Sequence, residues 1–163
     1  MTDEPKVHER DPHRIAAHEA GHALAAILSG VAVRDVNLIA PTPNLGVLKD
    51  PRWSGWTNLV DGEIEPAKRS IIKMAGGVAE DLIFGNVEEG SCEHDLDVIK
   101  NLLGDDPARL AQLREETTKL LRPHLDTLKL IADDLFDWRI LTGESIKLLL
   151  STGRRRPGMR PAR

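Results

Sequence analysis

The sequence predicts a mainly α-helical fold with a small β element, an α+β class. Apolar residues recur at helical spacing through most of residues 11–151, and proline or glycine stands near the start or end of several of these segments. Residues 31–39 instead alternate between apolar and polar types, as a strand does. The 163 residues are 40% hydrophobic, which suits one globular domain and excludes a fibrous or wholly disordered protein.

The N-terminal part predicts one long helix followed by strands. The helix begins after Asp11, a good N-cap residue, with Pro12 in its first turn, and it ends at Gly30. Residues 31–39 (VAVRDVNLI) predict a strand. Prolines then break the chain, and residues 45–48 (LGVL) predict a second short strand.

The rest of the chain predicts one loop and five helices. Residues 50–65 are expected to form the loop, whose two tryptophans are more often loop anchors than substrate contacts. A helix with apolar residues at regular spacing runs from Pro66 to Gly85. Ser91 caps the next expected helix. Three further helices are expected, at residues 107–121, 123–137 and 143–150.

The two ends of the chain differ from the region between them. Residues 1–10 are a polar leader, and residues 152–163 form a basic tail that is expected to be disordered. The last ten residues hold five arginines, so the remainder has 17 basic residues against 26 acidic ones. This acidic body predicts no nucleic-acid partner, and no apolar run reaches the roughly 20 residues that span a bilayer. A single cysteine, Cys92, and the polar N-terminus predict a cytoplasmic protein without disulfides.

Residues 18–22 read His-Glu-Ala-Gly-His, an HExxH motif inside the first expected helix. Four residues turn a helix by about 400°, which places the two imidazoles on one face, roughly 6 Å apart along the axis. Two histidines in this arrangement can bind one divalent ion, and Glu19 beside them can take a proton from an attacking water. The motif therefore predicts a metal centre with His18 and His22 as ligands.

The residues around the motif predict that its helix is buried, because they are almost all apolar or small. Two histidines and a glutamate in such a helix are costly unless polar partners satisfy them. A metal ion with its water would do so, and hydrogen bonds within the core are the alternative. Gly21 lowers helix stability by up to about 1 kcal/mol, so it is expected to allow the close approach of another segment.

A catalytic zinc site needs a third protein ligand and one open position. Spacing alone does not choose among five downstream candidates, namely Glu80, Glu93, His94, Asp95 and Asp97. Glu80 lies on an otherwise apolar helix, where a lone carboxylate needs a partner, although a solvated or bridging carboxylate is the alternative. Asp95 lies in the first turn of a helix, where an acid also stabilises the helix N-terminus.

Three segments carry a resemblance to a known family: AAHEAGHALAA, AGGVAEDLIFG and HDLDVIKNLL. They are similar to consecutive motifs in the peptidase domain of FtsH-type AAA zinc proteases, and the resemblance covers about residues 11–151. It implies a zincin-like helical peptidase domain that holds Zn²⁺ through His18, His22 and Asp95. It also implies that Glu19 is the general base.

The same resemblance implies that Glu80 supports a ligand histidine, and that residues 33–48 form the edge that pairs with an extended substrate. The chain departs from the family in having no membrane helices and no GxxxxGK[ST] phosphate loop, so no ATP-driven unfolding is expected from it. Beside Asp95, Glu93 and His94 replace the small and amide residues of the family, so His94 could compete for the metal.

The sequence therefore predicts a zinc metallopeptidase that hydrolyses flexible or unfolded polypeptides. One alternative is a non-catalytic interaction module of the same fold, acting as a homo-oligomer or with an ATPase in trans. A second is a metal-dependent hydrolase of another kind of substrate. Residues that bind the substrate are not identified by these patterns.

Overall fold

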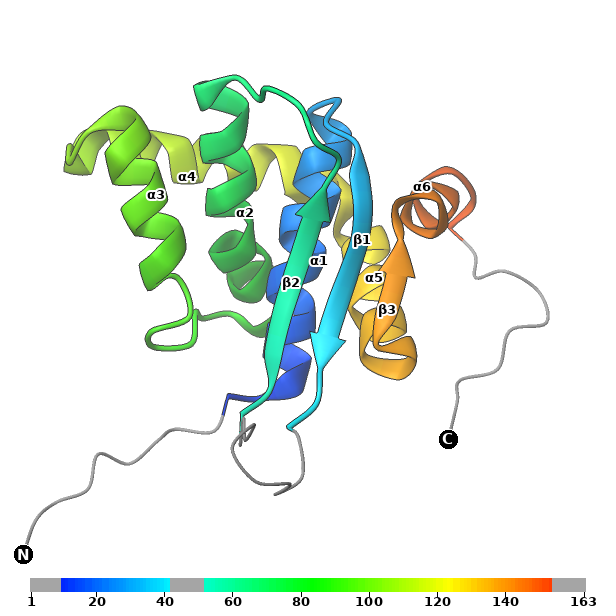
Figure 1. The fold of residues 1–163 in the computed structure, drawn as a ribbon. Coiled ribbons are helices and arrows are strands. Elements are labelled where there is room, and N and C mark those ends of the chain that lie inside the picture. Colours follow the sequence, from blue (N-terminus) through cyan, green and yellow to red (C-terminus); the bar gives the residue numbers. More distant parts are fainter. Residues whose placement is uncertain (1–9, 42–51, 154–163) are drawn as a thin grey trace, which may run out of the picture.

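The computed structural model describes residues 10–41 and 52–153, and it confirms the expected class, mainly helical with a small antiparallel sheet (Figure 1). The elements are, in chain order, α1 (Pro12–Leu28), β1 (Val33–Ile39), β2 (Ser54–Leu59), α2 (Pro66–Phe84), α3 (Glu93–Leu103), α4 (Pro107–Leu121), the 3₁₀ turn η1 (Arg122–His124), α5 (Leu125–Trp138), β3 (Ile140–Thr142) and α6 (Gly143–Thr152).

Three expected features lie outside the described residues. They are the polar leader apart from Arg10, the short strand at residues 45–48, and the basic tail beyond Gly153. Within the described residues, no helix combines the length and the apolar character needed to cross a membrane.

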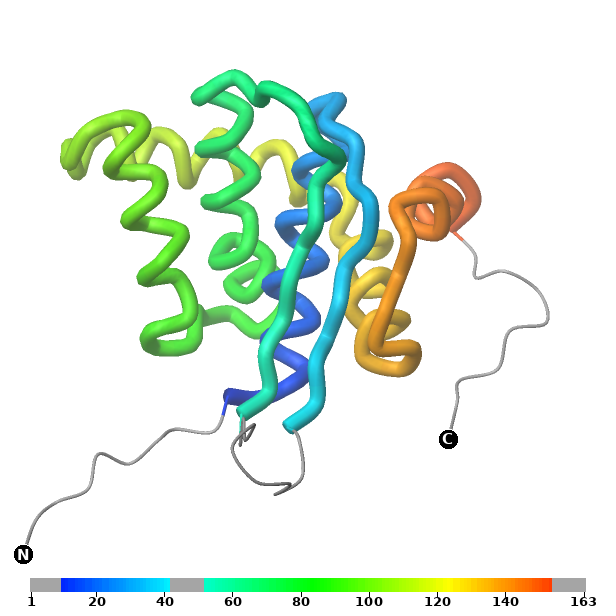
Figure 2. The backbone as a smooth tube through the Cα atoms, viewed as in Figure 1, coloured from blue at the N-terminus to red at the C-terminus, as the bar shows by residue number. Residues whose placement is uncertain are grey.

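Helix α1 is the buried centre of the fold. It begins as expected, because the Asp11 side chain accepts a hydrogen bond from the main-chain N–H of His13 and Pro12 occupies the first helical position. Residues 15–26 are all buried, since the sheet, α2 and α5 all pack against the helix (Figure 2). A helix enclosed in this way needs small or apolar side chains all round, which explains its many alanines.

Glycines allow α1 and α2 to pack closely, as the sequence predicted for Gly21. A Cβ atom on Gly21 would overlap the carbonyl oxygen of Ala75 and the side chain of Ala79. In the same way, a Cβ atom on Gly76 would overlap the imidazole ring of His18. The close packing of these two helices therefore brings the HExxH motif against the main chain of α2.

Among the described residues, the sheet has three antiparallel strands in the order β2-β1-β3, so β1 is central and β2 lies at an edge. Val36 and Leu38 of β1 are buried, and they pair with Thr57 and Gly55 of β2. Because α1 contacts both strands, this face of the sheet packs on α1. In Figure 1, β2 is drawn on the side of β1 nearer to α2 and α3.

The prediction of a loop at residues 50–65 is wrong in part, because Ser54–Leu59 form β2. Of its inward-facing positions, Leu59 packs on the core, Gly55 lies against Ile15 and Glu19, and Thr57 binds Glu19. The strand therefore lacks the alternation of apolar and polar residues by which a half-buried strand is recognised.

Smaller differences concern the later elements. β3 was not expected, since a strand of three residues is too short to show a period. α3 begins at Glu93 with Cys92 at the N-cap position, so Ser91 is not the cap. A 3₁₀ turn precedes α5, which starts at Leu125 rather than directly at residue 123.

Candidate metal centre

Five polar side chains from three helices meet beneath β2. α1 contributes His18, Glu19 and His22, α2 contributes Glu80, and α3 contributes Asp95. All five are buried, and Glu80 has no exposed surface at all. Charged groups are buried where they are paired or bind a metal ion, so each of these side chains is expected to have a partner.

The two histidines of the motif turn the same ring atom towards Asp95. The Nε2 atom of His18 lies 2.9 Å from Oδ2 of Asp95, and the Nε2 atom of His22 lies 3.2 Å from the same oxygen. The imidazole rings are nearly perpendicular, with centroids 4.6 Å apart. The helical spacing of four residues thus brings both rings to one point, as the sequence predicted, and α3 brings a carboxylate there.

The opposite nitrogen of each ring is held by an acceptor. Nδ1 of His22 lies 2.6 Å from the carbonyl oxygen of Ile72, which can only accept, so this nitrogen carries the proton. Nδ1 of His18 lies 2.8 Å from Oε1 of Glu80. Burial raises the pKa of Glu80, but the hydrogen bond with His18 and the N–H of Glu88 outweigh burial and lower it. Glu80 is therefore ionised, and the Nδ1–H of His18 donates to it.

This arrangement directs the lone pair of each Nε2 atom at the same carboxylate oxygen. Three electron-rich atoms cannot stay so close in a buried site unless a proton or a metal ion lies among them. Two imidazole nitrogens and a carboxylate oxygen are also a donor set that zinc binds in catalytic sites. The residues present therefore fit a Zn²⁺ ion.

The electrostatics of the site favour positive charge among these atoms. Burial raises the pKa of Asp95, but hydrogen bonds with His18 and His22 and the charge of Lys73 outweigh burial, so this pKa lies far below its usual value. Burial lowers the pKa of His18, yet the hydrogen bonds with Asp95, Cys92 and Glu80 leave it well above its usual value. The raised pKa of His18 and the lowered pKa of Asp95 both favour a positive charge between these side chains, which a bound metal ion would also supply.

Glu80 is surrounded by positive and hydrogen-bonding groups. Its Oε2 atom accepts the main-chain N–H of Glu88 at 2.9 Å, and guanidinium nitrogens of Arg10 and Arg14 lie 3.9 and 3.8 Å from its two oxygens. These contacts replace the water that a fully buried carboxylate has lost. They also keep the carboxylate charged and in place beside His18.

Glu19 lies next to the histidines, and ligand atoms of His18, Glu19 and His22 all lie within 4.8 Å of one another. Its Oε2 atom accepts a hydrogen bond of 2.7 Å from the hydroxyl of Thr57. The carboxylate borders a cavity of about 270 Å³ that is open to solvent between β2 and helices α2 and α3. Glu19 can thus reach a molecule that enters the cavity.

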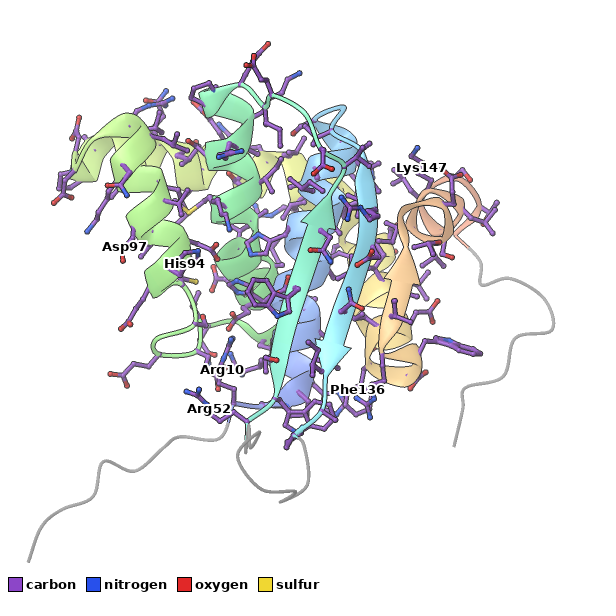
Figure 3. The ribbon with its side chains drawn as sticks, viewed as in Figure 1. Arg10, Arg52, His94, Asp97, Phe136 and Lys147 are labelled. Carbon is purple, nitrogen blue, oxygen red and sulfur yellow. The ribbon has the colours of Figure 1, made fainter. Side chains whose placement is uncertain are left out.

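The other sequence candidates for the third ligand lie elsewhere. Glu93, His94 and Asp97 are exposed on α3. His94 borders the cavity, and its side chain is exposed to solvent. Asp97 lies on the side of α3 away from α2 (Figure 3). Of the acids on this helix, Asp95 alone is buried with the histidines.

The structure adds three residues to the site that the sequence did not point to. The Nζ atom of Lys73 lies 3.0 Å from Oδ1 of Asp95, the sulfur of Cys92 lies near His18 and Glu80, and Thr57 contacts Glu19. Lys73 lies on α2 and Cys92 directly precedes α3. The apolar spacing that predicted these two helices does not involve either residue. Thr57 was hidden because its segment was interpreted as a loop.

The tryptophans of that segment have different surroundings. Trp53 packs against the guanidinium group of Arg139, whose central carbon lies 4.6 Å from a ring centroid. Trp56 is 62% exposed and borders the cavity. The role of loop anchor that was expected for both therefore suits Trp53 and does not suit Trp56.

Comparison with known proteins shows a distant similarity. No family model matches the chain. The chain is 25% identical, over an alignment of 196 positions, to the ATP-dependent zinc metalloprotease FtsH 2 of Sphaerobacter thermophilus. The alignment covers 94% of this chain and 29% of that protein, so the chain spans less than a third of the length of this relative. Nearly the whole chain is thus similar to one part of a zinc metalloprotease.

Proposed function

We propose that this protein is a zinc-dependent metallopeptidase that cleaves flexible or unfolded polypeptides. The observation that carries the proposal is the convergence of His18, His22 and Asp95 on one point, with Glu19 beside them at an open cavity. The similarity to a zinc metalloprotease supports the same activity. In this proposal the two histidines and Asp95 hold the ion, which leaves one coordination position for water and substrate.

The residues of the site divide the chemistry between them. Zinc, when bound, polarises the scissile carbonyl and lowers the pKa of water to near 7. Glu19 accepts the proton of the attacking water and passes it to the leaving amine. Glu80 and the carbonyl oxygen of Ile72 hold the two imidazoles with Nε2 towards the ion, so that neither ring has to reorient during the reaction.

The proposed substrate site is the free edge of β2. The sequence suggested residues 33–48; of these, β1 is paired on both sides and cannot accept another strand, while residues 42–48 lie outside the described residues. β2 has a partner on one side within the described residues, and Gly55, Trp56 and Thr57 border the cavity. An extended peptide paired with this edge would pass in front of Glu19, and a folded substrate could not adopt that conformation.

A casein-cleavage assay tests the proposal. Purified protein with zinc is expected to cleave casein or an unfolded peptide, and a chelator is expected to stop the cleavage. Glu19→Gln should keep one zinc per chain and lose nearly all hydrolysis, because it removes the proton acceptor and none of the ligands. The matched control is Glu63→Gln, which changes an exposed glutamate distant from the motif in sequence.

The outcomes separate the alternatives. A chain that binds zinc but cleaves no peptide supports a non-catalytic module, acting alone or with an ATPase in trans, or a hydrolase of another substrate. Full activity in Glu19→Gln contradicts its assignment as the base. The presence of Glu19 beside the metal-binding atoms argues against a non-catalytic module, since binding alone requires no base.

A further inference from the structure

We infer that Thr57 is a positioning residue for the catalytic carboxylate of Glu19, an inference that rests on the proposed function. The Oγ1 atom of Thr57 lies 2.7 Å from Oε2 of Glu19 and 3.2 Å from its main-chain oxygen. A hydroxyl has one proton to donate, and the shorter distance and the charge of the carboxylate direct it to Oε2. Thr57 thus holds one oxygen of the carboxylate.

No other described residue holds this carboxylate in the same way. Within residues 10–41 and 52–153, the hydrogen bond from Thr57 is the one that the Glu19 side chain accepts. The terminal torsion of a glutamate has broad minima, so an unheld carboxylate rotates readily. With Oε2 bound to Thr57, Oε1 is left to accept the proton of the attacking water.

Gly55 of β2 also lies against this side chain. A Cβ atom on Gly55 would lie 2.6 Å from Cγ and 3.1 Å from Oε1 of Glu19, and 2.7 Å from Cγ2 of the buried Ile15, so this position needs glycine. In the neighbouring strand, the inward positions are the buried apolar residues Val36 and Leu38. Opposite these two residues, β2 has the hydroxyl of Thr57 and the glycine at position 55, and both lie against Glu19.

This contact links two parts of the proposed mechanism. β2 is the edge strand with which we propose that the substrate pairs, and Thr57 connects it directly to the residue that transfers the proton. The peptide and the base are therefore placed by the same strand. Loss of the hydroxyl should impair proton transfer while leaving the strand edge available for binding.

Kinetic constants of two variants test the inference. Thr57→Val keeps the shape and strand preference of the side chain but removes the hydroxyl, so we expect kcat to fall roughly ten- to hundredfold, with KM changed less than about twofold. Thr57→Ser keeps the hydroxyl and should retain kcat to within about threefold. Thr118→Val is the control, because that exposed hydroxyl binds only the main chain of α4.

Two structural measurements accompany the kinetics. Zinc content and the thermal unfolding midpoint should stay at the wild-type level in Thr57→Val, which separates positioning from a loss of folding or of metal. In crystal structures of the metal-free proteins, the Glu19 carboxylate should be rotated or disordered in Thr57→Val and ordered in Thr57→Ser. His18 and His22 should keep their places in both.

The results distinguish this inference from the proposed function. An active wild-type protein together with a fully active Thr57→Val, or with an unmoved Glu19 carboxylate in that variant, overturns the inference alone. A Thr57→Ser variant as impaired as Thr57→Val overturns it as well. A wild-type protein without metal-dependent hydrolysis overturns the proposed function and this inference with it.

Discussion

For single residues, the geometry of the site depends on the hydrogen bond that the Nδ1 atom of each histidine makes. His22 donates to a carbonyl oxygen that belongs to the main chain of α2, whereas His18 donates to the charged Glu80. Both contacts leave Nε2 directed at Asp95, where we propose that the metal binds. The two proposed ligands are therefore oriented by α2, which in this proposal supplies no ligand itself.

Removal of the third ligand should abolish stoichiometric zinc binding. Asp95→Ala takes away the carboxylate that faces both Nε2 atoms, so two ligands remain where a stable catalytic site needs three. Metal analysis of the purified variant is expected to show much less than one zinc per chain. Asp97→Ala, which changes an exposed acid two residues away, should bind zinc normally. Unchanged zinc in Asp95→Ala would move the assignment to another acid or to His94.

The charge on Glu80 should strengthen zinc binding without contacting the ion. Glu80→Gln keeps an acceptor for the Nδ1–H of His18 but removes the negative charge that makes the imidazole a better ligand. Loss of such a supporting group weakens metal binding by about 10- to 100-fold. Competition with a chromophoric chelator measures the change. The same affinity as wild type would reduce Glu80 to a partner of Arg10 and Arg14.

At the scale of elements, the close packing of α1 on α2 controls the site. Alanine and glycine along the contact bring the helix axes together, and the main chain of α2 then reaches the ring of His22. Larger side chains would hold the helices apart and break these hydrogen bonds. The small residues of the motif helix thus serve the proposed metal centre as well as the core.

A methyl group at Gly21 should destabilise the protein. Alanine is better than glycine in a helix by up to about 1 kcal/mol, but here its Cβ would overlap the Ala75 carbonyl oxygen. Overpacking of this kind costs about 1–3 kcal/mol, so the overlap is expected to outweigh the gain. Urea denaturation of Gly21→Ala should show a lower free energy of unfolding. A more stable variant would contradict the close approach.

At the scale of the whole molecule, the site joins segments that are far apart in the chain. His18 and Asp95 are 77 residues apart, and the helices that carry them are connected through the sheet and α2. A metal ion bound between them would connect the first helix to the third. Because the unfolded chain cannot form this site, binding of the ion should stabilise the fold.

Zinc should therefore raise the thermal unfolding midpoint. A free zinc concentration 100 times the Kd stabilises the folded state by about 2.7 kcal/mol, which corresponds to an increase of roughly 5–10 °C in Tm for a chain of this size. Differential scanning fluorimetry with added zinc and then a chelator measures the shift and its reversal. Magnesium, which prefers oxygen ligands, should have little effect, and Asp95→Ala should not respond to zinc.

Local patterns in the sequence were sufficient for the helical part of the fold. Asp11 and Pro12 begin α1, and Gly85 ends α2 in the left-handed conformation that favours glycine. The spacing of apolar residues predicts both helices between these ends. The spacing of His18 and His22 likewise predicts that both rings share one face. Each of these features depends on residues within about one helical turn of one another. They can therefore be predicted without knowledge of the tertiary contacts.

Other features of the site depend on contacts between segments that are distant in the sequence. No period relates Asp95 to the HExxH motif, so the sequence could not choose it over Glu93 or Asp97; the packing of α3 beside α2 turns that one acid towards the imidazoles. β2 was missed for a related reason. Two of its inward residues, Gly55 and Thr57, lie against Glu19, and that contact exists only after the sheet has packed on α1.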